Sequence, residues 1–442
     1  MTALAPATWW RGLGNLTRSG SPVEGLSWAL YDFANTIYSY AVVSYAMGLW
    51  TVDRLGPDAG QFWFGVAFAV SVLLNAIVSP ILGAASDTVG RRLPFLLVFT
   101  VICIGGTALI AFVPEGAAAA AIGLGLFAVT NFAYQAALIY YDATLPSVAR
   151  TDARGRMSGV GVAIGYLGTI FVALLILILG TEASGATFLL AAAMFALFSV
   201  PLFAFVHERS ATTKSLSVRE VAGSWSQLAT TVRDVRQIPG LGRFLVGRFF
   251  YTDPVNTVIV VMAVFATQAI GFTQAEANLV LLTLTVAAVI ASLIWGQMVE
   301  RIGPKRTLMI VLATWVLGLF IGGIYLSVPT FFIAGVLLGA ALGGVWTSDR
   351  VFMLRLSPPD KVGEFFGLYG LVGKLSAVTG PLLYGLIVNL LLEPLGTAAY
   401  QVAIFSLLGL MAIGFFLLRG VPEPPAGADE PDVIGSAIPD LS

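Results

Sequence analysis

One polar pattern occurs twice in this chain, as Asp32-Phe33-Ala34-Asn35-Thr36 and again as Asp253-Pro254-Val255-Asn256-Thr257. Each copy lies inside a long apolar run. An acidic side chain inside a bilayer is costly, so it usually faces a cavity or a polar partner and marks a functional site. The asparagine and threonine follow the aspartate by three and four residues, which places them on one face of a helix. The repeat therefore predicts two related halves, each opening with a helix that carries a polar stripe.

The composition indicates the class of protein. Of the 442 residues, 58% are hydrophobic and 11% are charged, and the mean hydropathy is +0.90. Soluble domains carry about 25% charged residues, so this composition is typical of an integral membrane protein. Apolar runs long enough to cross a bilayer as helices, at least ~17 residues each, recur along nearly the whole chain. We expect twelve spans, at 26–50, 61–85, 93–113, 118–145, 157–180, 187–206, 244–270, 276–299, 306–327, 330–355, 364–391 and 398–418.

The placement of charges predicts the orientation of these spans. Basic residues gather in the two tails and the even-numbered loops, whereas the other loops offer Arg54 beside several acids. The positive-inside rule therefore places both termini in the cytosol. We expect a multi-pass protein of the cytoplasmic (inner) membrane that works as a monomer.

The spans divide the chain into five segments. We expect a cytosolic N-terminal tail (1–24), a six-helix bundle (25–206), a cytosolic connector (207–243), a second six-helix bundle (244–419) and a disordered cytosolic tail (420–442). Apolar residues at three-to-four spacing between 218 and 235 predict an amphipathic surface helix in the connector. The N-terminal tail lacks the features of a cleavable signal peptide.

Three further pairs of motifs match between the halves, in the same order along each. They are Gly83-x3-Asp87-x2-Gly90-Arg91-Arg92 with Gly296-x3-Glu300-x2-Gly303-Pro304-Lys305-Arg306, Asp142 with Asp349, and Gly155, Gly159 and Gly165 with Gly363, Gly367 and Gly373. Such an ordered series predicts two parallel repeats related by an axis along the membrane normal, the architecture of major facilitator transporters. The predicted fold is therefore all-α, with twelve transmembrane helices in two six-helix bundles and a pseudo-two-fold repeat.

The segment from Gly83 to Arg92 resembles the major facilitator signature between spans two and three. Within that superfamily, the run Ala29-Leu-Tyr-Asp-Phe-Ala-Asn-Thr36 resembles the vacuolar-effluxer-like branch, named for an autophagy-related yeast exporter of amino acids. The runs 156–168 and 363–374 resemble the same branch. This resemblance implies a secondary transporter that moves a small polar solute by alternating access, with amino acids as the first candidate.

A second resemblance offers an alternative substrate. Asp32, Asp142 and Lys374 are similar to acids in spans one and four and a lysine in span eleven of the glycoside-pentoside-hexuronide symporters. That similarity implies a sugar–cation symporter. Asn75 and Ser79 stand where that family has two acids in span two, which departs from its pattern for cation coupling.

Polar side chains within spans one, four, seven and eleven form the predicted substrate or proton site. They are Asp32, Asn35, Thr36, Asn131, Tyr134, Gln135, Asp253, Asn256 and Lys374. Intramembrane polar residues of this kind usually face the interior of the bundle. Lys374 lies deep in its span, and a buried ammonium requires an anionic partner. We expect that partner to be Asp253, Asp349 or a carboxylate of the substrate.

Charged residues near the cytosolic ends of the spans are the predicted gate. They are Asp87, Arg91, Arg92, Asp142, Glu300, Arg306 and Asp349. Arginine–carboxylate pairs between the halves would hold the inner side closed while the outer side is open. Two interpretations remain for Asp142 and Asp349: an inner latch, with Arg91, Arg92 or Arg150 as the partner of Asp142, or a ligand of the substrate.

The sequence does not favour an enzyme. It has one histidine and one cysteine, Cys103, and no phosphate-binding loop, zinc-protease helix or Ser/His/Asp set. We expect no cofactor, no metal site and no nucleic-acid partner. The predicted function is transport of a small molecule, coupled to protons or as facilitated efflux. The alternative from another class is a membrane scaffold, in which the polar stripes pair with each other and leave no central cavity.

Overall fold

The computed structural model describes residues 12–179, 185–208 and 235–425. The expected amphipathic helix at 218–235 lies outside these residues except for its last position, and so does most of the expected C-terminal tail. The structure therefore tests neither of those two expectations.

The first half contains six spanning segments. They are α2–η1–α3 (Pro22–Tyr38, Ser39–Ala46 and Met47–Leu55), α4 (Pro57–Val89), α5 (Leu93–Ile110), α6 (Ala117–Ala143), α8 (Arg154–Leu179) and α9 (Gly185–Phe205). Two short turns, α7 (Leu145–Val148) and η2 (Thr151–Ala153), join α6 to α8. The first span is one continuous rod, but a π-helical stretch at Ser39–Ala46 interrupts its α-helical bonding.

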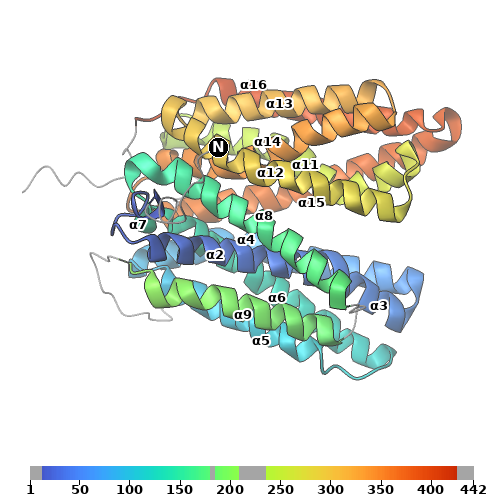
Figure 1. Cartoon of the computed structure of the whole chain (residues 1–442), viewed down its shortest axis with the longest axis horizontal. Helices are drawn as coiled ribbons and strands as arrows, with labels where there is room; N and C mark the ends of the chain where they lie inside the picture. Colours follow the sequence, from blue (N-terminus) through green and yellow to red (C-terminus); the bar gives the residue numbers. More distant parts are fainter. Residues whose placement is uncertain (1–11, 180–184, 209–234, 426–442) are drawn as a thin grey trace, which may run out of the picture.

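The second half repeats the arrangement. Its segments are α11–η3 (Leu241–Phe265 and Ala266–Ile270), α12 (Gln274–Ile302), α13 (Pro304–Ile324), α14 (Val328–Leu356), α15 (Val362–Leu395) and α16 (Ala398–Arg419). Among the described residues, eleven segments qualify as membrane spans by length and hydropathy. The interrupted first segment completes the twelve predicted spans. Figure 1 shows the halves as two bundles side by side, coloured blue to green and yellow to red.

The two ends of this double bundle differ. We call "tail end" the end that carries the segment 12–21, the α4–α5, α6–α8, α12–α13 and α14–α15 connections, and the last residue of α16. The opposite end is the "far end". At the tail end, Gly90 ends α4 with φ +71°, a left-handed conformation that favours glycine, and α5 begins three residues later.

The halves touch at the tail end through matched glycines. A Cβ atom on Gly83 of α4 would lie 2.0 Å from the carbonyl oxygen of Gly363 of α15. The other half of the repeat mirrors this contact, because a Cβ on Gly155 of α8 would lie 2.7 Å from the carbonyl oxygen of Gly296 of α12. Each crossing brings two backbones into contact, which only residues without a side chain allow.

The same helix faces separate at the far end. Gly65 precedes Gly83 by 18 residues and Gly385 follows Gly367 by 18, which is about five full turns at 3.6 residues per turn, so the members of each pair share a helix face. A Cβ on Gly367 would lie 2.4 Å from the Ser79 oxygen, whereas Gly65 and Gly385 have nothing within 4 Å of theirs. Helices α4 and α15 therefore meet at the tail end and diverge toward the far end.

Candidate functional site

Two signature carboxylates join the halves at the tail end. Asp87 of α4 accepts hydrogen bonds from the backbone N–H groups of Gly363 (2.9 Å) and Glu364 (2.8 Å) in the first turn of α15. Glu300 of α12 accepts one from the backbone N–H of Arg156 in α8 (3.0 Å) and forms an ion pair with its guanidinium. A helix N-terminus attracts negative charge and offers free N–H donors. The structure thus brings Asp87 and Glu300, two of the four predicted gating acids, to the start of a helix in the opposite half.

The basic residues of the signature lie in different places. Arg92 forms an ion pair with Asp87 at 3.1 Å, within the first half. Arg91 and Arg306 are exposed at the surface.

A buried ion pair joins α6 to α14. Arg350 Nη1 donates to Asp142 Oδ1 at 2.9 Å, and the same guanidinium donates to the Ser158 hydroxyl of α8 at 3.0 and 3.1 Å. It also lies 5.2 Å from the centre of the Trp28 ring. The prediction that Asp142 pairs with Arg91, Arg92 or Arg150 was wrong, because α14 brings Arg350 closer, and Arg150 pairs with its neighbour Asp152.

Asp349 is buried within the second half. Arg248 of α11 pairs with it at 3.1 Å, and the hydroxyl groups of Tyr251 and Tyr369 donate to its oxygens at 2.8 and 3.2 Å. The Arg248 guanidinium lies 3.5 Å from the centre of the Tyr369 ring. The hydrogen bonds and the ion pair of this network connect α11, α14 and α15 to one another.

Lys374 reaches from one half to the other. Its ammonium donates to Asn75 Oδ1 and, at 3.0 Å, to the Ser79 hydroxyl, both on α4. The predicted pairing with Asp253 or Asp349 was wrong, since Arg248 occupies Asp349 and Asp253 faces another part of α15. Within the described part of the chain, the contacts of this ammonium are thus to neutral oxygens.

The polar stripe of span one faces α8. A Cβ on Gly161 would lie 3.1 Å from Asp32 Oδ2, so the carboxyl group rests against a glycine. The Thr36 hydroxyl donates to the Gly165 carbonyl at 2.5 Å. Asn35 and Tyr134 are both buried. Asp32, Asn35 and Tyr134 therefore lie where α2, α6 and α8 meet, whereas Thr36 joins two helices of the same half.

The predicted site residues of span four, Asn131 and Gln135, lie in different surroundings. Asn131 is fully buried, and its side-chain N–H donates to the Ser71 hydroxyl of α4 at 2.7 Å, while its Oδ1 has no hydrogen-bond partner among the described residues. Gln135 is half-buried. Asn131 thus holds α4 against α6 with one acceptor unused.

The repeat in the sequence is one residue out of register with the repeat in space. Thr36 contacts the Gly165 carbonyl, and the residue that contacts the matched Gly373 carbonyl is Asn256, at 3.5 Å. Asn256 is therefore the spatial counterpart of Thr36, and Thr252 rather than Asp253 is that of Asp32. A shift of one residue turns a side chain by about 100° around a helix. Asp253 consequently lies on a different face of its helix from the one that Asp32 occupies in the first half.

Similar contacts show which residues of spans four and ten occupy equivalent positions in the two halves. Tyr141 stacks on Trp28 with ring centres 4.7 Å apart, in the position where Asp349 binds Arg248 in the second half. Asp142, one residue later, thus corresponds to Arg350. The ion pair between these two residues therefore joins symmetry-related positions. The sequence missed the role of Arg350, although it stands directly beside the predicted Asp349.

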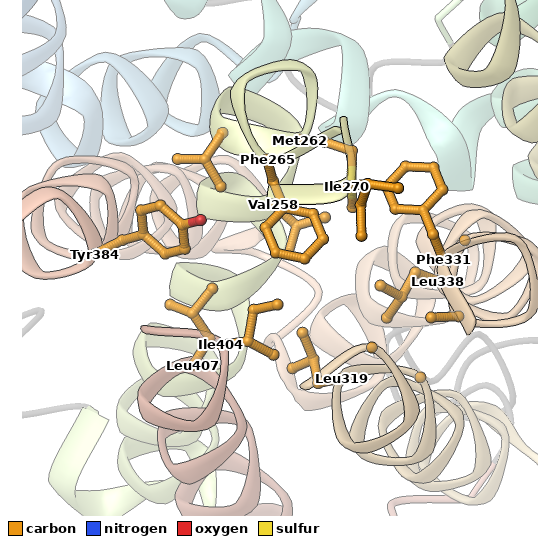
Figure 2. A pocket seen from close by; sticks show the side chains of 15 residues that line it. Val258, Met262, Phe265, Ile270, Leu319, Phe331, Leu338, Tyr384, Ile404 and Leu407 are labelled. Carbon is orange, nitrogen blue, oxygen red and sulfur yellow. The ribbon is translucent and has the colours of Figure 1, made fainter. Parts of the chain in front are cut away.

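Two cavities lie in the second half. The first, about 30 Å³, is apolar, and the Tyr384 hydroxyl points into it among Phe265, Leu338 and Ile404 (Figure 2). The second, about 160 Å³, includes Asp253. Asp32, Asn131 and Lys374 line neither of these cavities, so neither provides the evidence that would exclude a scaffold role.

Known proteins similar to this chain indicate its class. A sequence model of the family described as vacuole effluxer Atg22 like matches residues 64–424. The uncharacterized MFS-type transporter YxiO of Bacillus subtilis (strain 168) is 28% identical over 414 residues, covering 90% of this chain and 94% of that protein. Autophagy-related protein 22 of Yarrowia lipolytica (strain CLIB 122 / E 150) is 28% identical over 308 residues, covering 61% of this chain and 51% of that protein.

Solved structures support the fold. The human organic anion transporter MFSD10 (TETRAN) has a TM-score of 0.66 at 19% identity, covering 90% of this chain and 98% of that one. The proton:xylose symporter XylE has a TM-score of 0.67 at 15% identity, covering 91% and 95%. At these identities the likeness confirms the predicted major facilitator fold. Because the family match extends over most of the sequence, this chain belongs to the vacuole effluxer Atg22-like family of major facilitator transporters, and it is a transporter rather than an enzyme.

Proposed function

We propose that this secondary transporter moves a small zwitterionic solute of the amino-acid type by alternating access. Both termini lie in the cytosol, so the tail end faces inward, and the protein works as a monomer in the cytoplasmic membrane. Asp32 carries the coupled proton or meets the ammonium group of the solute.

The contacts of Lys374 carry this proposal. Of the charged side chains deep in the spans, Arg248 is paired with Asp349 and Arg350 with Asp142. Lys374 has neutral partners, Asn75 and Ser79. A buried ammonium gains most from a carboxylate within hydrogen-bond distance. A solute carboxylate fits this requirement, whereas a neutral sugar does not.

Asp32 supports the zwitterion over a simple anion. Its carboxyl group lies against Gly161 of α8 and forms no ion pair below 4 Å with the described residues. Lys374 and Asp32 thus both lack a close ionic partner among the described residues. An α-amino acid brings the two complementary charges on a single small molecule.

The tail-end contacts supply the gate in this proposal. Asp87, Glu300 and the Asp142–Arg350 pair connect the halves at that end, where glycine backbones also touch. Opening inward requires all of them to separate, so they favour a state that is closed inside and open outside. Substrate entering from the far end would compete for Lys374 and weaken its hold on α4.

A counterflow screen tests the substrate class. Liposomes that contain the purified protein are preloaded with unlabelled amino acids, monocarboxylates or hexoses. Uptake of the labelled form of the same compound is then followed. We expect accumulation with one or more amino acids, and we expect the Lys374→Gln variant to lose it while Lys305→Gln, altered in the first turn of α13, retains it. Accumulation of hexoses alone would favour the sugar–cation symporter and reject the zwitterion.

Proton coupling requires a separate measurement. Uptake by wild type under an imposed pH gradient is compared with uptake by Asp32→Asn, which cannot release a proton. The variant should lose the response to the gradient while retaining exchange. An unchanged response in Asp32→Asn would show that the proton travels elsewhere.

A further inference from the structure

We propose that the chain has a second binding site, lateral to the region between the halves, where Asp253 binds the ammonium group of a small lipophilic amine. The site is the cavity at the junction of α11, α15 and α16. It does not depend on the substrate proposed above.

The cavity has the size of a small aromatic ring. Its volume is about 160 Å³, and a cavity of about 150 Å³ accommodates benzene in another protein. Its walls are Phe249, Phe250 and Asp253 of α11, Thr379 and Leu383 of α15, and Leu410 of α16. Thr379 and Leu383 are exposed, so the walls reach the surface of the helix bundle. A molecule dissolved in the bilayer therefore has a lateral route into the cavity.

Asp253 is the charged wall of this cavity. The residue is 2% exposed, its Oδ1 accepts a hydrogen bond from the Thr379 hydroxyl, and among the described residues the backbone N–H of Gly380 is the further donor beside this carboxyl group. Oδ2 lies against Gly380, where an added Cβ would approach it to 2.3 Å. Within the described residues, no lysine or arginine forms an ion pair with this carboxyl group, in contrast to Asp142 and Asp349.

The first half fills the corresponding place with hydrocarbon. Thr36 and Asn256 are spatial counterparts, so Phe33, three residues before Thr36, corresponds to Asp253. The Phe33 ring lies 4.6 Å from Phe198 of α9 and 5.6 Å from Phe171 of α8, measured between ring centres. Three phenylalanines thus occupy a junction that the second half leaves partly empty. A helix junction needs neither a cavity nor an acid to pack well, so both point to a ligand.

The walls define the chemistry of that ligand. A buried carboxylate is stabilised by a cation that also donates a hydrogen bond, and an ammonium group does both. Phe249 and Phe250 offer aromatic faces to the cation and to an apolar body. The site therefore fits a primary amine attached to a ring or branched chain of about six carbon atoms. An alcohol of the same shape fills the space without supplying the charge.

Fluorine NMR of the full-length protein in lipid nanodiscs tests this site. The two probes are 4-fluorobenzylamine and 4-fluorobenzyl alcohol, each titrated against wild type and variants at one lipid concentration, so that partition into lipid cancels. We expect Asp253→Asn to weaken the amine by about tenfold or more and the alcohol by less, because charge-assisted hydrogen bonds are the stronger ones. Asp253→Phe, which copies the first half, should abolish binding of both probes. Leu383→Trp fills the cavity from the other wall if Asp253→Phe does not fold.

The Asp152→Asn variant is the matched control, because it removes an exposed acid of the first half, away from this cavity. It should bind both probes as wild type does. Equal amine affinity in wild type and Asp253→Asn would overturn the proposal, and so would loss of amine binding in Asp152→Asn. Neither result bears on counterflow, which is measured without the amine.

Discussion

Replacing Asp142 by asparagine should open the tail end. The change leaves the Arg350 guanidinium without its carboxylate partner across the halves. The two side chains are 21% and 5% exposed, so the pair is largely buried. Removing one member of a buried pair costs about 3–5 kcal/mol. We take the lower value, about 3 kcal/mol, because Arg350 keeps its bonds to Ser158, and this corresponds to a factor of about 100 in the closed–open equilibrium.

Cysteine accessibility measures this shift. Cys103 is fully buried and is the sole cysteine in the sequence, so the background of labelling is low. Ser86 of α4 is 1% exposed and lies against α15, because a Cβ on Gly363 would be 2.5 Å from its hydroxyl oxygen. Maleimide labelling of a Ser86→Cys reporter in liposomes therefore follows the open population. We expect Asp142→Asn to raise the labelling rate by about 100-fold.

Asp152→Asn is the matched control for this measurement. Asp152 also pairs with an arginine, at 3.0 Å, but the two side chains are 65% and 53% exposed. Exposed pairs contribute about 0–1 kcal/mol, so this variant should change the labelling rate by less than about fivefold. Similar rates in the two variants would refute the view that the buried pair holds the halves together.

Three further changes test the contacts around this pair. Gly83→Ala places a Cβ 2.0 Å from the Gly363 oxygen, so labelling of the Ser86→Cys reporter should rise. Gly65→Ala, whose Cβ has nothing within 4 Å, should leave that labelling unchanged. Equal effects of the two variants would show that α4 packs equally loosely at both positions. Asn75→Asp gives Lys374 a carboxylate partner across the halves and should slow both labelling and counterflow, and faster counterflow would contradict the role given to Lys374. Tyr369→Phe removes a 3.2 Å hydrogen bond to Asp349 and should lower the free energy of unfolding by about 1–3 kcal/mol, measured by thermal or denaturant unfolding; a change below the error of that measurement would mean that the Arg248–Asp349 pair needs no such support.

The sequence predicted most of the course of the backbone, namely the spans and their repeat. The length of each apolar run fixes a span, and the paired Gly and Asp or Glu motifs identified the repeat. The structure confirms that Asp87 and Glu300 are equivalent, since each binds the start of a helix in the other half. The sequence did not predict the π-helical interruption at Ser39–Ala46, because a one-residue change in hydrogen bonding leaves hydropathy unaltered.

The partners of charged residues were the weaker part of the prediction. An ion pair depends on which helix faces are brought together, and a rotation of about 100° per residue makes a register error of one residue decisive. The identity of Asp32 with Asp253 and of Asp142 with Asp349 suggested equivalence, yet the backbone contacts equate their neighbours. Lys374 illustrates the same limit, because its partners Asn75 and Ser79 lie on the other half of the molecule.

The central claim is that the two ends of the bundle open in alternation, and a pair of reporters tests it most directly. Ser86→Cys reports on the tail end and Gly65→Cys on the same face of α4 at the far end. Introducing Asp142→Asn should raise labelling of the Ser86→Cys reporter without raising labelling of the Gly65→Cys reporter. If the far-end rate rises together with the tail-end rate, or the tail-end rate does not change, the ends do not alternate and the account is wrong.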